Sequence, residues 1–103
     1  SKSCWILNES HAVLEVEDIG SQVVLCGQLV QVKSYKKWTF LNFVDSYPEA
    51  VFTGVIADES VTEFQGINRL LNSNVCISGI LTQYRNKYQI NLTVNSQWVR
   101  NEK

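Results

Sequence analysis

Apolar and polar residues alternate in two stretches that share one pattern, Val-x-(Leu/Ile)-x-Gly-x-Leu-x-Gln, at residues 23–31 and 75–83. A period of two residues is typical of a strand with one buried face. Glycine is a poor strand residue, and inside such a run it usually marks a bulge or a bend, as at the corner of a barrel. The two copies therefore predict two bent strands, with the bends near Gly27 and Gly79.

Three further strands are expected from the same period. Residues 38–45 are rich in aromatic and β-branched side chains, and residues 50–57 follow a turn that contains Pro48. A tight turn at Arg85-Asn86 precedes a regular alternation over residues 87–99. The predicted strands are thus residues 22–33, 38–45, 50–57, 75–84 and 87–99.

One helix is expected between the third and fourth strands. Ser60 and Glu63 have the spacing of a capping box, and apolar residues follow at helical intervals as far as Leu71. Gly66 costs ~1 kcal/mol relative to Ala within a helix, so a short or broken helix is predicted. Asp58 and Glu59 would favour its N-terminus.

The resulting element order is that of an OB-fold, a five-stranded Greek-key barrel with its helix between strands three and four. A five-stranded sandwich is the alternative, but the placed helix and the two glycine bends favour the barrel. We assign residues 13–103 to this domain and residues 1–12, which show no period, to an N-terminal arm. No apolar run approaches the ~20 residues of a membrane-spanning helix.

Charge is unevenly distributed in this chain of net charge −1. Residues 19–44 and 64–101 contain Lys and Arg but no Asp or Glu. A basic face is therefore compatible with the near-neutral total, although ordinary solvated side chains at strand ends would look the same in sequence.

Aromatic and basic residues are interleaved in two groups at the predicted strand ends. OB barrels that bind single-stranded nucleic acid stack bases on aromatic side chains of strands two and three, with cations along the backbone. Flanking loops join strands one and two, and strands four and five. The candidate binding residues are Tyr35, Lys36, Lys37, Trp38, Phe40, Tyr84, Arg85, Lys87 and Tyr88.

Strand alternation separates the core from the candidate site in residues 38–45. Leu41 and Phe43 fall on the core side, which places Trp38 and Phe40 on the outer side. Two large apolar side chains there fit a binding surface. The alternative is that the N-terminal arm, with Trp5, covers them.

Neither a metal site nor a catalytic site is predicted. The three cysteines and the single histidine lack metal-binding spacing, and no glycine-rich phosphate loop is present. We expect no cofactor and no enzymatic activity. Cys26 and Cys76 share the outer side of two neighbouring antiparallel strands, so a disulfide could form if their Cα atoms lie ~5.5 Å apart in an oxidising compartment. Two buried free thiols are the alternative, which the sequence slightly favours.

The chain resembles a family of bacterial OB-fold domains found in secreted or lipid-anchored proteins, some of them beside nuclease domains. The resemblance covers residues 20–97 and rests on Val23-Val24-Leu25-Cys26-Gly27, Thr39-Phe40-Leu41-Asn42, Tyr47-Pro48, Phe52-Thr53, Val55-Ile56, Phe64, Ile77-Ser78-Gly79-Ile80, Tyr84, Gln89-Ile90, Leu92-Thr93 and Ser96-Gln97. It implies nucleic-acid binding and a periplasmic or lipid-anchored location.

Two functions are compatible with this sequence. The first is non-catalytic binding of single-stranded or flexible nucleic acid, DNA or RNA, on the barrel face. The alternative is an extracytoplasmic interaction module that binds a protein or an oligosaccharide on the same face, because one fold can serve several ligands.

Overall fold

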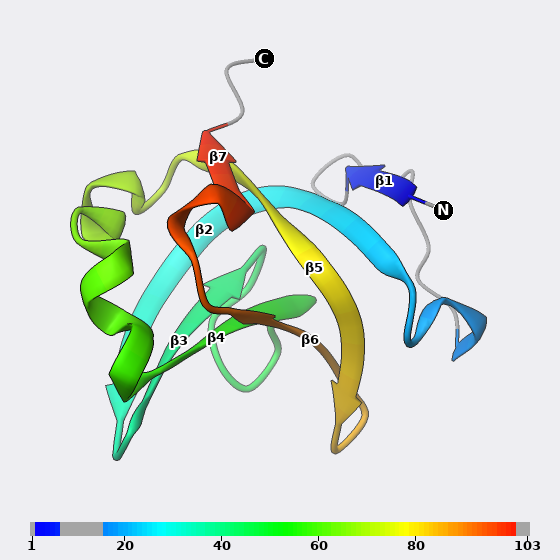
Figure 1. Cartoon of the computed structure of the whole chain (residues 1–103), viewed down its shortest axis with the longest axis horizontal. Coiled ribbons are helices and arrows are strands. Elements are labelled where there is room, and N and C mark those ends of the chain that lie inside the picture. The colour runs from blue at the N-terminus through cyan, green and yellow to red at the C-terminus, as the bar shows by residue number, and fades with distance from the viewer. Residues whose placement is uncertain (1, 7–15, 101–103) are drawn as a thin grey trace.

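The computed structural model describes residues 2–6 and 16–100, in which five strands close into a ring (Figure 1). The ring runs in the order β2, β3, β4, β6 and β5, and closes because β5 also pairs with β2. All neighbours are antiparallel except β4 and β6, which are parallel. The predicted OB-type barrel is confirmed. Its strands are β2 (Gln22–Tyr35), β3 (Trp38–Phe43), β4 (Phe52–Ala57), β5 (Asn74–Tyr84) and β6 (Lys87–Leu92).

Two long strands bend and change partners, as the repeated pattern predicts. β2 pairs with β5 as far as Gln28 and with β3 from Leu29 onward. β5 pairs with β2 as far as Ile80 and with β6 from Leu81 onward. Each change of partner comes one or two residues after the glycine of the pattern, Gly27 or Gly79. The glycines therefore mark the barrel corners.

Two short strands extend the ring into a second sheet of order β1-β2-β5-β7. β1 (Lys2–Ile6) pairs in parallel with the first half of β2, and β7 (Trp98–Arg100) pairs with β5. Part of the predicted arm is thus a strand, whereas residues 7–15 lie outside the described residues. The expectation of one strand over residues 87–99 is wrong. Gln97 Oε1 accepts hydrogen bonds from the N–H groups of Thr93 and Val94, which turns the chain after β6 at η5 (Asn95–Gln97).

The helical segment lies between β4 and β5, as predicted, but it consists of two 3-10 helices, η3 (Asp58–Phe64) and η4 (Ile67–Leu70). Gly66 separates them with a φ of 88°, which confirms the predicted break. The predicted capping box is wrong, because the helical turn already begins at Asp58 and Ser60 lies within it. Among the described residues, no helix is long and apolar enough to cross a membrane. A further 3-10 turn, η2 (Val16–Asp18), precedes β2.

Among the described residues, one apolar cluster fills the barrel, and within it the rings of Phe43 and Phe52 stack with their centroids 4.4 Å apart. Leu41 and Phe43 are fully buried, as strand alternation predicts. The cluster comprises Val23, Leu25, Leu29, Leu41, Phe43, Phe52, Ile56, Phe64, Ile67, Leu70, Val75, Ile77, Leu81, Ile90 and Leu92. It draws on every strand of the ring and on both η3 and η4.

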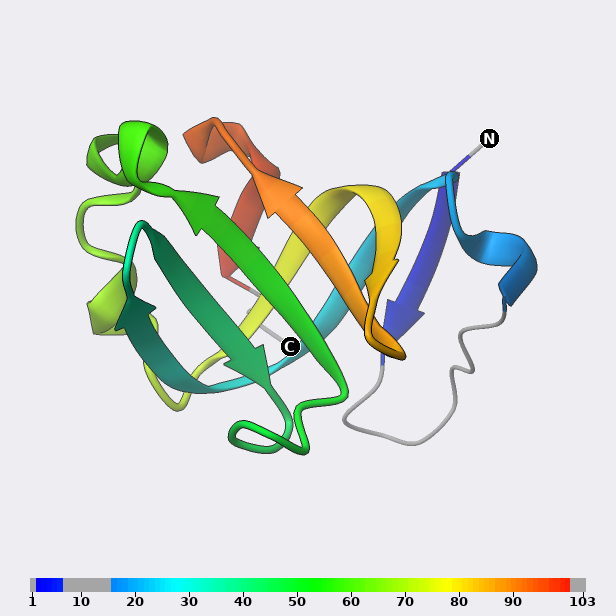
Figure 2. The ribbon, with the colours of Figure 1, turned by 90° about the horizontal axis from the view of Figure 1, so that it is seen from below.

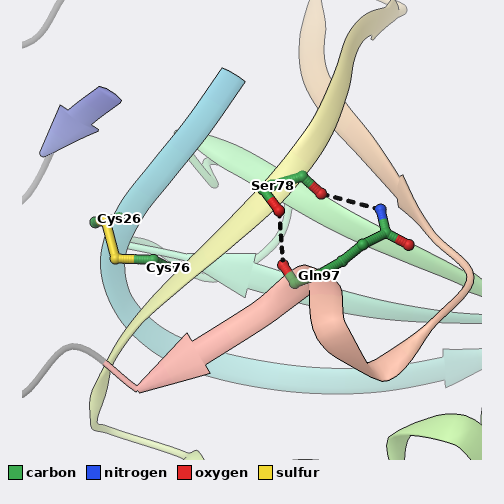
Figure 3. Close-up of a disulfide and its surroundings, with 4 residues drawn as sticks. All are labelled: Cys26, Cys76, Ser78 and Gln97. Atoms are coloured by element: carbon green, nitrogen blue, oxygen red, sulfur yellow. Dashed lines mark hydrogen bonds between the residues drawn. A yellow bond between two sulfur atoms is a disulfide. The ribbon is translucent and has the colours of Figure 1, made fainter. Parts of the chain in front are cut away.

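A disulfide joins Cys26 of β2 to Cys76 of β5 (Figure 3). The sequence slightly favoured two free thiols, and this expectation is wrong, because the cysteines form the disulfide that was the other possibility. The two residues lie directly opposite each other in the antiparallel register, with their Cα atoms 4.0 Å apart, so their side chains meet. The sequence indicated the shared face but not this register.

Removing the disulfide should lower the free energy of unfolding by about 2–4 kcal/mol, because it closes a long loop in the unfolded chain. The bridge spans a sequence separation of 50 residues. Denaturant titrations with and without a phosphine reductant measure the change, and a Cys26→Ala/Cys76→Ala variant should not respond to the reductant. Mass spectrometry after alkylation of the unfolded, unreduced chain should leave Cys26 and Cys76 unmodified. Their full alkylation would contradict the bridge.

The two glycines of the repeated pattern should differ in their tolerance of alanine. An added Cβ at Gly79 would lie 2.6 Å from Ile90 Cγ2, and the residue has a φ of +156°. At Gly27 the nearest atom, Val44 Cγ2, would lie 3.3 Å away. We expect Gly79→Ala to destabilise the barrel by about 1–3 kcal/mol through overpacking. Gly27→Ala should cost clearly less in the same thermal unfolding experiment, and equal losses would contradict the assignment.

Candidate nucleic-acid interface

A groove of about 900 Å³ follows the outer face of β2, β3, β4 and β6. Figure 2 shows this side of the barrel, with β3, β4 and β6 side by side. The residues that line it come from these strands, from the end of β5, and from the turns or loops that join β2 to β3, β3 to β4 and β5 to β6: Lys33, Tyr35, Lys36, Trp38, Phe40, Asn42, Tyr47, Pro48, Ala50, Thr53, Val55, Tyr84, Arg85, Lys87, Gln89 and Asn91. Within the described part of the chain, none of the residues that line the groove is acidic.

Strand alternation determines which side chains reach this groove. Its residues in β3 and β4 have the opposite parity to the core residues of the same strands, so Phe40 and Val55 face outward while Leu41 and Ile56 face inward. The cross-strand register then builds rows across the face. One row joins Lys33, Phe40, Val55 and Asn91. A regular sheet therefore fixes the floor of the groove.

Tyrosines and cations alternate around the rim. The Lys36 Nζ lies 5.3 Å from the ring centroid of Tyr35, and the Arg85 Cζ lies 5.3 Å from that of Tyr84. Lys33 lies over Tyr47 in the same way, at 5.4 Å. Such contacts contribute about 0.5–1 kcal/mol at exposed sites. They hold each cation beside an aromatic surface that remains largely exposed.

Each of the two hairpin tips presents a tyrosine followed by a cation. The β2–β3 tip presents Tyr35 and Lys36, and the β5–β6 tip presents Tyr84 and Arg85; both tips lie on the same side of the molecule in Figure 1. Lys36 and Arg85 have positive φ angles of 57° and 51°. A non-glycine residue in this left-handed region is uncommon and costs roughly 1–2 kcal/mol. The chain thus carries a cation where glycine would be easier to accommodate.

A buried polar network underlies one end of the groove. Asn42 Nδ2 donates to Gln31 Oε1 at 2.8 Å, and Thr53 Oγ1 donates to Asn42 Oδ1 at 2.9 Å. Asn42 and Thr53 are both buried. Buried polar groups are costly unless they are hydrogen-bonded, so this network is what allows a polar floor beneath the aromatic rim.

Seven of the nine predicted site residues line the groove: Tyr35, Lys36, Trp38, Phe40, Tyr84, Arg85 and Lys87. Lys37 is exposed at the β2–β3 tip but does not line the groove, because it alternates with Lys36. Tyr88 packs against the core, since it shares the inward side of β6 with Ile90. Both of these residues depart from the predicted arrangement.

The groove also contains residues that the prediction omitted, above all Lys33, Tyr47, Gln89 and Asn91. The polar alternation of β6 places Gln89 and Asn91 on the outer side, which was a usable signal. Lys33 faces the groove because the register irregularity after Leu29 reverses the alternation of β2, so that Val32 rather than Lys33 packs against the core. Tyr47 is brought in by the β3–β4 loop, where its N–H donates to Gln31 Oε1.

Trp38 is 46% exposed and forms part of the groove wall. The alternative was that the N-terminal arm covers it. β1 instead pairs with residues 22–26 of β2, on the second sheet, whereas Trp38 pairs with Tyr35 and Ala57. The described part of the arm, residues 2–6, thus lies away from Trp38.

The other described residues offer little that could carry chemistry. No group of three or more His, Cys, Asp or Glu residues is arranged to hold a metal ion in this part of the chain. A smaller cleft of about 380 Å³ lies between η3, η4 and the β2–β3 hairpin, and its described lining contains no charged side chain. The groove is therefore the stronger candidate site.

Comparisons with solved structures support the fold. The chain is similar to a chain of the S. pombe Stn1–Ten1 complex, with a TM-score of 0.58 and 13% identity over 80% of this chain and 59% of that one. It is also similar to OBody AM1L10 bound to hen egg-white lysozyme, with a TM-score of 0.60 and 18% identity over 84% of each chain. A third match is asparaginyl-tRNA synthetase from Pyrococcus horikoshii, with a TM-score of 0.59 and 22% identity over 82% of this chain and 20% of that enzyme. No family model and no curated protein sequence matches the chain.

The two lysines of the β2–β3 tip should respond oppositely to glycine. Lys36 has a φ of 57°, whereas the neighbouring Lys37 has no positive φ. Lys36→Gly should leave the free energy of unfolding unchanged or raise it by up to about 1 kcal/mol, because it relieves the left-handed conformation. Lys37→Gly should lower it by about 0.5–1 kcal/mol, because glycine adds entropy to the unfolded chain. Denaturant unfolding of both variants measures the difference, and equal losses would show that the tip stores no strain.

Proposed function

We propose that this domain binds single-stranded or flexible nucleic acid, without catalysis, in the groove across β2, β3, β4 and β6. The observation that carries the proposal is the lining of that groove. It combines exposed aromatic rings with four cations, Lys33, Lys36, Arg85 and Lys87, and its described lining contains no acid although the chain has a net charge of −1. Base stacking and backbone neutralisation need this combination.

Different residues of the groove would contact the bases and the phosphates of the bound strand. Trp38 and Phe40 offer flat surfaces for bases, at about 1–3 kcal/mol per stacked base. The tips at Tyr35 and Tyr84 hold cations where a phosphate backbone would enter and leave. A phosphate that approaches the rim meets a cation already placed beside an aromatic ring, so one tip can contact a base and its phosphate together.

The structural neighbours are compatible with this function. By its name, the Pyrococcus horikoshii synthetase acts on a transfer RNA, and the part of it that matches this chain shares the barrel. The chain spans only 20% of that enzyme, so its aminoacylation chemistry is not part of the proposal.

Binding of a protein or an oligosaccharide on the same face is the second candidate. It is favoured by the neighbours whose names describe protein complexes, the OBody bound to lysozyme and the Stn1–Ten1 complex. Exposed tyrosines and a tryptophan suit such partners as well. The salt dependence of the affinity distinguishes the two candidates, because binding of a phosphate backbone releases counterions.

We further propose a periplasmic or lipid-anchored extracytoplasmic location. The Cys26–Cys76 disulfide is consistent with an oxidising compartment outside the cytoplasm, where such bridges persist. The family resemblance supplies the more specific location.

Binding of a fluorescently labelled, 12-nucleotide single strand at several salt concentrations tests the proposal. The logarithm of affinity should fall with the logarithm of salt by about 0.7 per phosphate contact, so four engaged cations give a slope of about −3. Lys33→Glu/Arg85→Glu should weaken binding more than tenfold and flatten this slope. Surface charges of this kind contribute little to stability, so the melting temperature should change little.

A matched control is available on the same barrel. Arg69→Glu/Arg100→Glu makes the same change in net charge, but neither residue lines the groove. Its affinity should stay within about threefold of the parent chain. Equal weakening by both variants would show a general charge effect, and a parent chain that binds no oligonucleotide would overturn the proposal in favour of the second candidate.

A further inference from the structure

Three side-chain amides line the groove among the described residues, those of Asn42, Gln89 and Asn91, and they are used in two different ways. Gln31 and Asn42 are bonded to each other within the polar network at the floor. Gln89 and Asn91 also line the groove, yet within the described residues neither of their side-chain amides has a hydrogen-bond partner. An amide that faces a groove with both its donor and its acceptor unused is suited to reading a polar ligand.

The orientation of the bonded pair is fixed by the backbone. The N–H of Tyr47 can only donate, and it donates to Gln31 at 3.0 Å. The oxygen of Gln31 must therefore face both Tyr47 and Asn42, so Asn42 presents its NH₂ to Gln31 and its oxygen to Thr53. These groups satisfy one another and cannot turn to a ligand without breaking the network.

β6 holds Gln89 and Asn91 through their main-chain carbonyls. Thr82 Oγ1 donates to the carbonyl oxygen of Gln89 at 3.0 Å. Gln97 Nε2 donates to that of Asn91 at 3.1 Å. Figure 3 shows Gln97 reaching over from η5, where it also bonds to Ser78 of β5. The backbone of β6 is thus held at both residues while the two side-chain amides remain available.

The register places these amides across the floor from an aromatic side chain. Phe40 pairs with Val55, and Val55 pairs with Asn91; one row along, Thr53 pairs with Gln89. Phe40 and Asn91 are therefore two strand spacings apart, roughly 9–10 Å between their backbones. A planar base that contacts Phe40 above Val55 would direct its edge toward β6.

We propose that Gln89 and Asn91 form a base-reading pair, which gives this groove a preference among the four bases. The inference rests on the proposed function, since it assigns specificity to the same site. A carboxamide can donate and accept at once, and its usual bidentate partner among the bases is adenine. Adenine is therefore the expected preference. Stacking and phosphate contacts alone would tolerate every base.

Fluorescently labelled homo-oligonucleotides of about eight nucleotides, one for each DNA base, test the inference because they match the site size of one OB barrel. The parent chain should bind the adenine oligomer about tenfold more tightly than the weakest of the four, the ratio expected from one bidentate contact. In Gln89→Ala/Asn91→Ala that ratio should fall to about one. The matched control is Asn68→Ala/Gln83→Ala, which removes one asparagine and one glutamine that do not line the groove. This variant should keep the tenfold ratio.

The outcomes separate the two proposals. Equal affinity of the parent chain for all four oligomers would overturn the base-reading pair while leaving nucleic-acid binding in place. A ratio that persists in Gln89→Ala/Asn91→Ala would also overturn it, and so would a preference for a base other than adenine. Absence of binding to every oligomer would overturn both proposals. Melting temperatures within a few degrees of the parent show that the variants are folded.

Discussion

The barrel depends on one feature of its hydrogen bonding: its ring of strands closes through β2 and β5, each of which belongs to two sheets at once. Both strands do so by bending and exchanging partners along their length. The exchange joins the four-stranded groove face to a second sheet that contains β1 and β7. It also carries the far ends of β2 and β5 to the groove rim, where their hairpin tips present Tyr35 and Tyr84. The position of the candidate site therefore follows from the way the ring closes.

The disulfide lies in the half of β2 and β5 where the two strands pair with each other. The tips lie in the other half, where the strands have separated. The disulfide between Cys26 and Cys76 thus fixes the shared segment from which both tips extend. The core is filled by the inward-facing residues of the same strands. Stability and site geometry rest on different faces of the same strands, so surface changes in the groove should leave the core intact.

Much of the fold could be predicted from the sequence because it depends on local patterns. The period of two identified all five ring strands, and the repeated glycines marked both corners. The features that were not predicted are element boundaries, and these depend on tertiary contacts. Gln97 ends the alternating run after β6 by bonding to two N–H groups, and nothing in the local pattern signals this. The helical turn begins at Asp58 rather than at the apparent cap Ser60.

The same division applies to the candidate site. The aromatic and basic residues of each tip are adjacent in sequence, so the sequence pattern was enough to predict that they lie together. Lys33 and Tyr47 meet only through the β3–β4 loop, and Tyr88 is drawn inward by the core. The choice between a disulfide and free thiols at Cys26 and Cys76 depended on a strand register that composition cannot provide.

The acid-free groove on a chain of net charge −1 has a consequence for the kinetics of association. At physiological ionic strength, charges are screened beyond about 8 Å, and the molecule as a whole does not attract a polyanion from a distance. Encounters with a charged polymer would then be unsteered, at rates nearer 10⁵–10⁶ M⁻¹s⁻¹ than the ~10⁸–10⁹ of strongly steered pairs. For a ligand that binds without steering, differences in affinity would lie mainly in the dissociation rate, so selectivity would depend on how long a correctly seated segment stays bound.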